Sequence, residues 1–378
     1  MVIIGIALVI VACKKAPISN GNSSSTGNTN SGGNNNQNGG NTTAIFKGSA
    51  GVYCLGQSPN TAVDPLAYSN PGIVGVVLKI NWDQLETSPG NFDWTFFDTE
   101  LIKCKANNKK ASIEVLGYPA WVITSLGASS YNYVDNNPAH STYLQTLQGV
   151  VSFDNIYLSR IANLINNLSN KYANDTTVAY LNLISGQISR NLPDSIVSNG
   201  IKKAFWTQYK YNADTVVSKM KPLLDLYMTK FPNTPLWNSV DYVTFETTAS
   251  GKAVNYLASQ YVTYGVGKYP DRFGCYREDI GACTPLDPPP SGNQWYIMSQ
   301  NSIRTGGQMI WNVQDGPNFR QNKCGIMPNT KQAVLDSAVN HGLKYGMRYL
   351  EIYSVDVTDA TLSTSMVNYT KLLRTKVK

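Results

Sequence analysis

The sequence has 378 residues, of which 42% are hydrophobic and 15% are charged, so it can bury a large core, and one large domain with insertions accounts for its length. The net charge is +7, but the lysines are scattered and no basic run carries interleaved aromatic residues, so we expect no nucleic-acid partner. Only two histidines occur, His140 and His341, and neither lies near a Ser or Cys nucleophile pattern, which excludes most triad chemistry.

The N-terminus begins with an apolar run that is too short to span a bilayer and is typical of the core of a signal peptide. The run ends Ile10-Val11-Ala12-Cys13, which resembles a bacterial lipobox, in which the cysteine after a small residue becomes the lipid-modified N-terminus. We therefore expect residues 1–13 to be a signal peptide with lipidation at Cys13. This implies a lipid-anchored protein of the bacterial cell envelope, at the outer membrane or cell surface, and an uncleaved anchor is the alternative.

A polar tether follows the lipobox. Residues 14–43 are dominated by Asn, Gly, Ser and Thr, and such a segment cannot bury enough apolar area to offset the entropy of the chain. We expect this linker to be flexible and the folded domain to comprise residues 44–378.

The stretch from Val76 to Val122 predicts a strand, a helix and a second strand. An apolar run, Ile73 to Ile80, is followed by apolar residues three and four apart at positions 96, 97, 101 and 102. Asp93 or Thr95 is a plausible N-cap, and the helix is expected to end at Asn107-Asn108, just before the apolar run at residues 111–116. This spacing is typical of a parallel βαβ unit.

The same alternation continues to the end of the chain. We expect eight strands, over residues 51–55, 73–81, 111–116, 178–185, 235–240, 272–279, 307–313 and 349–355. Helices are expected over residues 155–172, 201–230, 251–266, 331–342 and 363–375. Alternating strands and helices are what a parallel barrel requires.

Several motifs in this order resemble the clan A glycoside hydrolases, the superfamily of β-galactosidases and cellulases. They are W-x-x-L-E from Trp82, P-G-x-F-D-W from Pro89, NKKASIEV from Asn108 and GYPAWV from Gly117. The resemblance covers most of Gly51 to Leu373 and implies an α/β fold, a single (β/α)8 TIM barrel. An open doubly wound sheet is the alternative, disfavoured because no Gly-rich phosphate loop follows the first strand.

The resemblance also implies a sugar-binding cleft at the C-terminal ends of the barrel strands. Flat aromatic rings stack on sugar faces and also hydrogen-bond, and the chain holds 23 tyrosines and 7 tryptophans, most of which we expect in the core. The residues expected to contact substrate are Trp82, Glu86, Tyr118, Trp121, Trp311 and Asn312.

Retaining members of the clan use two glutamates, at the ends of the fourth and seventh strands, as acid/base and nucleophile. At the end of the fourth strand, Gln187 or Asn191 stands where the resemblance implies a glutamate, and at the seventh strand Gln308 does. An amide keeps the shape of a carboxyl group but has no proton to donate near neutral pH and is a far weaker nucleophile. Such a pair holds a sugar without cutting it.

Other carboxylates lie at or near strand ends and provide alternative acids. The best candidates are Asp194, Asp315, Glu351 and Asp356, and the remaining ones are Glu86, Asp241, Glu246, Glu278 and Asp279. Alternation along strands predicts that Lys79 meets Glu114 inside the barrel and that Arg277 meets Asp279 there too. The simplest interpretation of both is a buried ion pair.

The cysteines agree with an exported protein. Without Cys13 the chain has Cys54, Cys104, Cys275, Cys283 and Cys324, with no spacing typical of zinc. We expect a disulfide of Cys283 with Cys275 or Cys324, no metal and no cofactor.

Three functions remain open from the sequence. The first is hydrolysis of glycosidic bonds in polysaccharide or oligosaccharide by carboxylates such as those above. The second is a catalytically inactive barrel that binds glycans, and the third is substrate-assisted hydrolysis with a single acid. In each case we expect a carbohydrate ligand, a membrane contact through the lipid anchor, and a monomer.

Overall fold

The computed structural model describes residues 46–56, 58–134, 142–182, 212–240, 256–289, 293–314 and 330–375. Eight parallel strands close into a barrel, and the last of them pairs with both the seventh and the first. In barrel order they are β1 (Gly51–Leu55), β2 (Ile73–Asn81), β5 (Lys110–Leu116), β8 (Val178–Asn182), β9 (Leu236–Ser239), β10 (Phe273–Ile280), β11 (Thr305–Met309) and β12 (Met347–Tyr353). The predicted TIM barrel is confirmed, and the doubly wound sheet is wrong because the sheet has no free edge.

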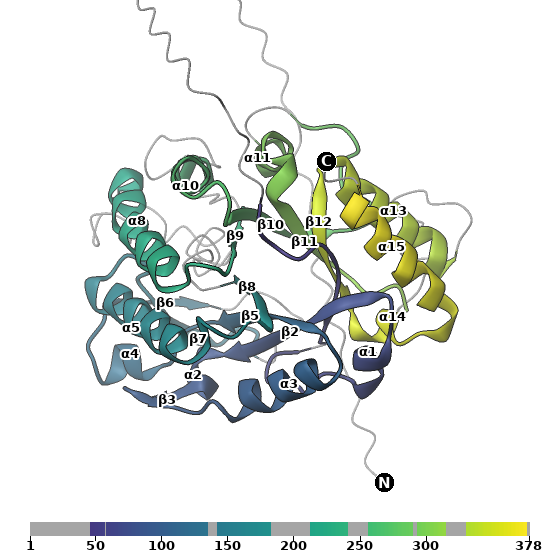
Figure 1. The fold of residues 1–378 in the computed structure, drawn as a ribbon. Coiled ribbons are helices and arrows are strands. Elements are labelled where there is room, and N and C mark those ends of the chain that lie inside the picture. The colour runs from purple at the N-terminus through teal and green to yellow at the C-terminus, as the bar shows by residue number, and fades with distance from the viewer. Residues whose placement is uncertain are drawn as a thin grey trace, which may run out of the picture.

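The helices lie outside the barrel (Figure 1). The longer ones are α3 (Thr95–Ala106), α5 (Asn155–Tyr172), α8 (Ala213–Lys230), α10 (Tyr256–Lys268), α11 (Gln294–Gln300), α13 (Lys331–Lys344) and α15 (Ser363–Thr375). The short ones are α1 (Pro65–Ser69), α2 (Trp82–Leu85), α4 (Trp121–Thr124) and α14 (Ser354–Val357), with 3-10 turns at Ser302–Arg304 and Ala360–Leu362. Helices α5 and α8 pack side by side, as do α13 and α15 (Figure 1).

Helix α5 forms where the apolar periodicity predicts it. The side chain of Asp154 caps its first turn by accepting hydrogen bonds from the amides of Ile156 and Tyr157, at 2.8 and 3.1 Å. Its buried face consists of Tyr157, Leu158, Ile161, Leu164, Ile165, Leu168, Ser169 and Tyr172. The three-and-four spacing of these residues is what keeps one side of the helix on the barrel.

Helix α3 ends where expected, but its N-cap is Trp94, between the two residues expected there. The Asp93 carboxylate accepts a hydrogen bond from the Thr95 amide at 2.9 Å, and the helix ends before Asn107. Asn108 adopts a left-handed conformation with φ of 53°, which asparagine tolerates better than most residues. The chain thereby turns directly into β5.

Two hairpins interrupt the repeating pattern, and neither was predicted. The first pairs β3 (Glu86–Ser88) with β4 (Asn91–Phe92), and the second pairs β6 (Ser130–Val134) with β7 (Thr146–Val150). Both insertions leave from the C-terminal ends of barrel strands. The seventh and eighth strands also end earlier than predicted, at Met309 and Tyr353, and α14 starts where the eighth strand was expected to continue.

Large aromatic side chains fill the barrel toward the N-terminal ends of its strands. We call this cluster the aromatic plug, and it consists of Phe46, Tyr53, Tyr180, Trp237, Tyr276 and Tyr349, all of them buried. The rings of Tyr180 and Trp237 stack with centroids 4.9 Å apart, and those of Tyr53 and Tyr349 lie 4.5 Å apart. Several of the tyrosines that mark the composition are therefore core residues.

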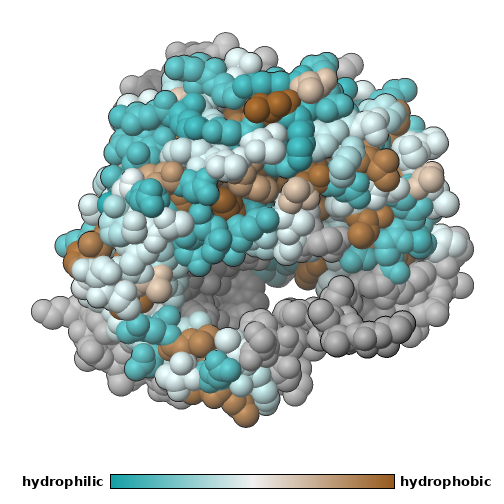
Figure 2. Space-filling view, turned by 90° about the horizontal axis from the view of Figure 1, so that it is seen from below, coloured by the Kyte–Doolittle hydropathy of each residue, from teal (hydrophilic) through white to brown (hydrophobic). Residues whose placement is uncertain are grey.

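The outer surface is mixed. On the face shown in Figure 2, hydrophobic residues lie as separate spots among hydrophilic ones. Within the described residues, no helix combines the length and the apolar character needed to cross a membrane.

Candidate functional site

A ring of polar side chains lies next to the aromatic plug, on the side of the C-terminal ends of the strands. Residues two apart on a strand share a face, so each residue two positions after an inward-facing one also points into the barrel, nearer the C-terminal end. We call this set the polar layer, and it consists of Lys79, Glu114, Asn182, Glu278, Gln308 and Glu351, from β2, β5, β8, β10, β11 and β12. Active sites of TIM barrels form at this end of the strands.

The ammonium group of Lys79 contacts two other residues of the polar layer. Its Nζ lies 2.9 Å from Oε2 of Glu114 and donates a hydrogen bond to Oε1 of Gln308 at 3.2 Å. Burial lowers the pKa of this lysine, but the carboxylates of Glu114, Glu351 and Glu278 outweigh that effect, and the net pKa is raised. Lys79 is therefore a charged ammonium group that holds the carbonyl side of the Gln308 amide.

Glu351 is the carboxyl group with the most unusual environment. Its Oε1 accepts a hydrogen bond from the Tyr349 hydroxyl at 2.6 Å, while its buried Oε2 has no hydrogen-bond partner among the described residues. Burial, and next the charge of Glu114, raise the pKa of Glu351 to about 8, although Lys79 and Tyr349 oppose the shift. At neutral pH this side chain is a neutral carboxylic acid.

Further buried polar atoms of the barrel interior have no hydrogen-bond partner within the described residues. They are Oε1 of Glu114, both amide atoms of Asn182 and Oγ of Ser239. Each such group costs about 1–3 kcal/mol when it is left unsatisfied, so proteins rarely keep several together. A concentration of this kind points to a polar occupant such as ordered water or the hydroxyl groups of a ligand.

Two of the residues expected to contact substrate are fully buried. Trp82 and Glu86 are both 0% exposed, and Nε1 of Trp82 donates to Oε2 of Glu86 at 2.9 Å. Glu86 also accepts from the Gly90 amide at 2.7 Å and pairs with Arg160. The two residues hold the β3–β4 hairpin against α2 and α5, and their contact with substrate stays a prediction.

The other aromatic candidates are partly exposed. Tyr118 donates its hydroxyl to the carbonyl of Gln148 at 2.8 Å, and Trp121 donates Nε1 to the carbonyl of Glu86 at 3.0 Å. Trp311 follows β11 and is half-buried. These three rings lie on the segments that follow β5 and β11 and keep some surface for contact.

The remaining site residues divide into two groups. Asn312 and Asp356 organise the chain after β11, because Asn312 Oδ1 accepts from the Gln314 amide at 2.9 Å and the Asp356 carboxylate accepts from the Val313 amide at 3.1 and 3.0 Å. Asp356 is 0% exposed. The expected positions Cys13, Gln187, Asn191, Asp194 and Asp315 lie outside the described residues.

Both predicted ion pairs form, but only the pair of Lys79 with Glu114 lies inside the barrel. Arg277 and Asp279 lie on the outer face of β10, because Tyr276, the residue before Arg277, points into the aromatic plug. Lys79 pairs with Glu114, and Arg277 Nε donates to Oδ1 of Asp279 at 2.9 Å. Sequence reasoning did not single out Asn182, which follows Tyr180 on the inner face of β8. Asn182 could have been predicted from strand alternation, because it lies two residues after an inward-facing tyrosine, but only once the register of the barrel is known.

The cysteines are only partly as expected. Cys54, Cys104 and Cys275 are free, buried thiols, and burial raises the pKa of each to about 12. Cys283 is in a disulfide whose other half lies outside the described residues, so its pairing with Cys275 is wrong. Among the described residues, no group of three or more His, Cys, Asp or Glu side chains is placed to hold a metal ion.

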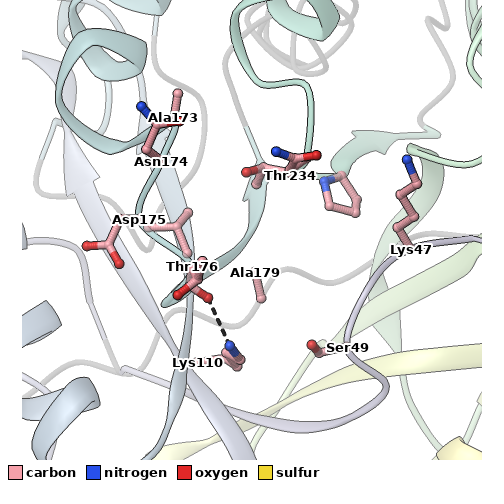
Figure 3. Close-up of a pocket in the computed structure, with 12 residues that line it drawn as sticks. Lys47, Ser49, Lys110, Ala173, Asn174, Asp175, Thr176, Ala179 and Thr234 are labelled. Carbon is pink, nitrogen blue, oxygen red and sulfur yellow. Dashed lines mark hydrogen bonds between the residues drawn. The ribbon is translucent and has the colours of Figure 1, made fainter.

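A pocket of about 250 Å³ lies at the opposite, N-terminal end of the strands (Figure 3). Its polar groups already have protein partners: Lys110 Nζ donates to the Thr176 carbonyl at 2.8 Å, and Lys47 pairs with Asp271 at 2.8 Å. Asp175 pairs with Lys105 at 2.9 Å. Because these charges are satisfied, the polar layer and not this pocket is the stronger candidate for a functional site.

Comparison with known proteins supports the fold. No protein-family model and no curated protein sequence matches the chain. Among solved structures, the catalytic domain of β-amylase from Paenibacillus polymyxa superposes with a TM-score of 0.51 at 9% identity, over 86% of this chain and 99% of that one. A β-galactosidase from Rahnella sp. R3 gives 0.50 at 10% identity, over 89% of this chain and 58% of that one. The barrel is thus a fold shared with β-amylase and β-galactosidase.

Proposed function

We propose that this protein acts on an oligosaccharide or polysaccharide at the C-terminal end of its barrel. The observation that carries the proposal is the polar layer, in which an ammonium group, carboxyl groups and amides converge inside the barrel where such folds build their active sites. Sugar hydroxyl groups both donate and accept hydrogen bonds, and this layer offers both kinds of partner. The motifs that resemble clan A glycoside hydrolases support the same ligand class.

Two versions of the proposal differ in chemistry. In the first, the protein cuts a glycosidic bond with carboxylates other than the expected pair. In the second, it binds a glycan without cutting it. Gln308 favours the second version over hydrolysis by the two glutamates typical of the clan. Its amide, which accepts from Lys79, stands where the resemblance implies a nucleophilic glutamate.

The test is binding and hydrolysis measured on one panel. Titration calorimetry and reducing-sugar assays with cello-, malto-, galacto- and xylo-oligosaccharides separate binding from turnover. We expect at least one of them to bind, and we expect Gln308→Ala to weaken that binding by about tenfold, since a hydrogen bond to a sugar is worth roughly 1.4 kcal/mol.

A matched control is Gln332→Ala. Gln332 lies on α13, where its amide donates to Asp336 and to Tyr369 at 2.9 and 2.8 Å, far from the polar layer in the topology. It should leave binding unchanged. The proposal is overturned if no glycan binds, or if the two variants have the same affinity as the wild type.

We also propose that the domain is held at the cell envelope by lipid on Cys13. The support is the apolar run that ends in Ile-Val-Ala-Cys and the polar tether that follows it. In a bacterial host, Cys13→Ser should move the protein from the detergent phase to the aqueous phase on Triton X-114 partition. An unchanged distribution argues for an uncleaved anchor.

A further inference from the structure

We propose that Glu351 and Glu114 form the acid–base pair of a glycoside hydrolysis reaction in this barrel. The inference rests on the proposed sugar binding and selects its hydrolytic version. It places the two carboxyl groups on β12 and β5, the eighth and third strands of the barrel, instead of on the fourth and seventh.

Glu351 is built as a proton donor. Tyr349, the inward-facing residue two positions earlier on β12, donates its hydroxyl to Oε1 of Glu351 at 2.6 Å. The other oxygen, Oε2, has no hydrogen-bond partner among the described residues. Because Oε1 accepts from a hydroxyl, a proton carried by this side chain belongs on Oε2.

Glu114 is the carboxyl group that contacts a cation. Lys79 pairs with its Oε2 at 2.9 Å, which stabilises the carboxylate, while Oε1 is left without a hydrogen-bond partner in the described chain. Asn182 pairs in register with Glu114 on the next strand, and its amide is also buried without a protein partner. A carboxylate oxygen beside an open amide is a suitable place to hold and activate a water molecule.

The reaction then balances with water as the only co-reactant. The proton on Glu351 Oε2 transfers to the glycosidic oxygen as the bond from that oxygen to the anomeric carbon breaks, so that the leaving group departs as an alcohol. Glu114 takes a proton from water, whose oxygen forms the new bond to the anomeric carbon. Solvent exchange returns the proton from Glu114 to Glu351, and the configuration at the anomeric carbon is inverted.

The two carboxyl groups have different neighbours, as an acid–base pair requires: Glu114 is paired with the Lys79 ammonium group, and Glu351 accepts from the Tyr349 hydroxyl. The titratable groups that bear on Glu351 come from four strands: Lys79, Glu114, Tyr276, Glu278, Tyr349 and Tyr353. Since the active form has Glu351 protonated, its raised pKa predicts activity that falls as the pH rises through about 8.

The decisive experiment compares two leaving groups. With Glu351→Gln, hydrolysis of an oligosaccharide that binds should fall by at least about 100-fold, because its alcohol must be protonated to leave. Hydrolysis of the matching 4-nitrophenyl glycoside should fall by less than about tenfold, because nitrophenolate leaves without a proton. Glu114→Gln should abolish both to a similar degree. A merely structural role for Glu351 would lower both substrates equally.

Glu100→Gln is the matched control. Glu100 is a buried glutamate outside the barrel interior, where it accepts from the Tyr68 hydroxyl at 2.5 Å and pairs with Lys103 at 2.7 Å. This variant should keep the wild-type rate and the wild-type ratio between the two substrates.

Wild-type measurements decide the matter even where a variant does not fold. An alkaline limb near pH 8 and inversion seen by NMR of the first product support the pair. Retention of configuration, a rate that is flat from pH 6 to 10, or binding with no hydrolysis of any bound glycan overturns it. Binding without hydrolysis leaves the proposed sugar binding intact, whereas the absence of any binding removes the proposed function itself.

Discussion

At the scale of single residues, Gln308 offers a direct test of the expected clan chemistry. Lys79 Nζ already lies 3.2 Å from Oε1 of Gln308, so a carboxylate at this position gains a counter-ion. In a Glu351→Gln background, we expect Gln308→Glu together with Gln187→Glu or Asn191→Glu to produce slow hydrolysis, because a barrel that orients a glycoside already supplies part of the rate. Timed reducing-sugar assays measure it.

Gln308→Glu alone is the control for that experiment. One carboxylate without its acid partner should give no more than the background rate. If the double variants are as inactive as the single one while they still bind the glycan, the assignment of Gln187 and Asn191 to the acid position is wrong.

Residues on regular strands could be predicted, and residues in turns could not. The period of two predicted the pair of Lys79 with Glu114 inside the barrel, because strand alternation fixes the face of each side chain. It also put Arg277 and Asp279 on one face, but that face of β10 points out of the barrel and not into it as expected. Trp82 and Glu86 belong instead to a turn of helix and a hairpin. These two residues are four apart, so their side chains meet, and both point into the protein. The sequence motif alone does not show whether they point into the protein or into the cleft.

At the scale of elements, the aromatic plug depends on glycines in the strands that surround it. A Cβ atom on Gly274 would lie 2.3 Å from Cζ3 of Trp237, and one on Gly75 would lie 2.6 Å from Cε1 of Tyr53. We expect Gly274→Ala to lower the free energy of unfolding by roughly 1–3 kcal/mol or more, through overpacking. Urea denaturation followed by tryptophan fluorescence measures the loss.

Gly267→Ala is the comparison for that change. Gly267 lies in α10, and nothing lies within 4 Å of the Cβ that alanine would add. Alanine is favoured over glycine in a helix by about 1 kcal/mol, so this variant should be neutral or stabilising. Equal losses at both glycines would mean that the plug is not tightly packed.

The same contrast explains which elements the sequence predicts. Helix α5 follows its apolar period from its first to its last residue, and the barrel strands follow continuous apolar runs. The hairpin strands lack a continuous apolar run, and they exist because each strand pairs with the other. Pairing is a tertiary property, so they were missed.

For the molecule as a whole, the buried acid makes stability depend on pH. The pKa of Glu351 is raised from 4.5 to about 8 on folding, so between these values the folded protein keeps a proton that the unfolded chain releases. Its contribution is therefore complete below about pH 4.5 and is lost as the pH rises to about 8, with a slope of at most ~1.4 kcal/mol per pH unit.

Glu351→Gln removes this dependence because the amide stays neutral. Urea denaturation at pH 5, 7 and 9 should show the wild type losing stability relative to the variant with each step. Parallel curves for the two proteins would mean that Glu351 is ionised in the fold and would contradict the buried acid.

The closure of the barrel sets an order of events during synthesis. β1 completes its pairing only with β12, at residues 347–353, and the amide of Val52 is bonded to Thr370 Oγ1 of α15 at 3.0 Å. A chain that emerges amino end first therefore carries β1 as an open sheet edge until β12 has been made. The closed barrel therefore cannot form before residues 347–353 have been made. Loss of even the final helix should leave a product that proteases and chaperones treat as unfinished.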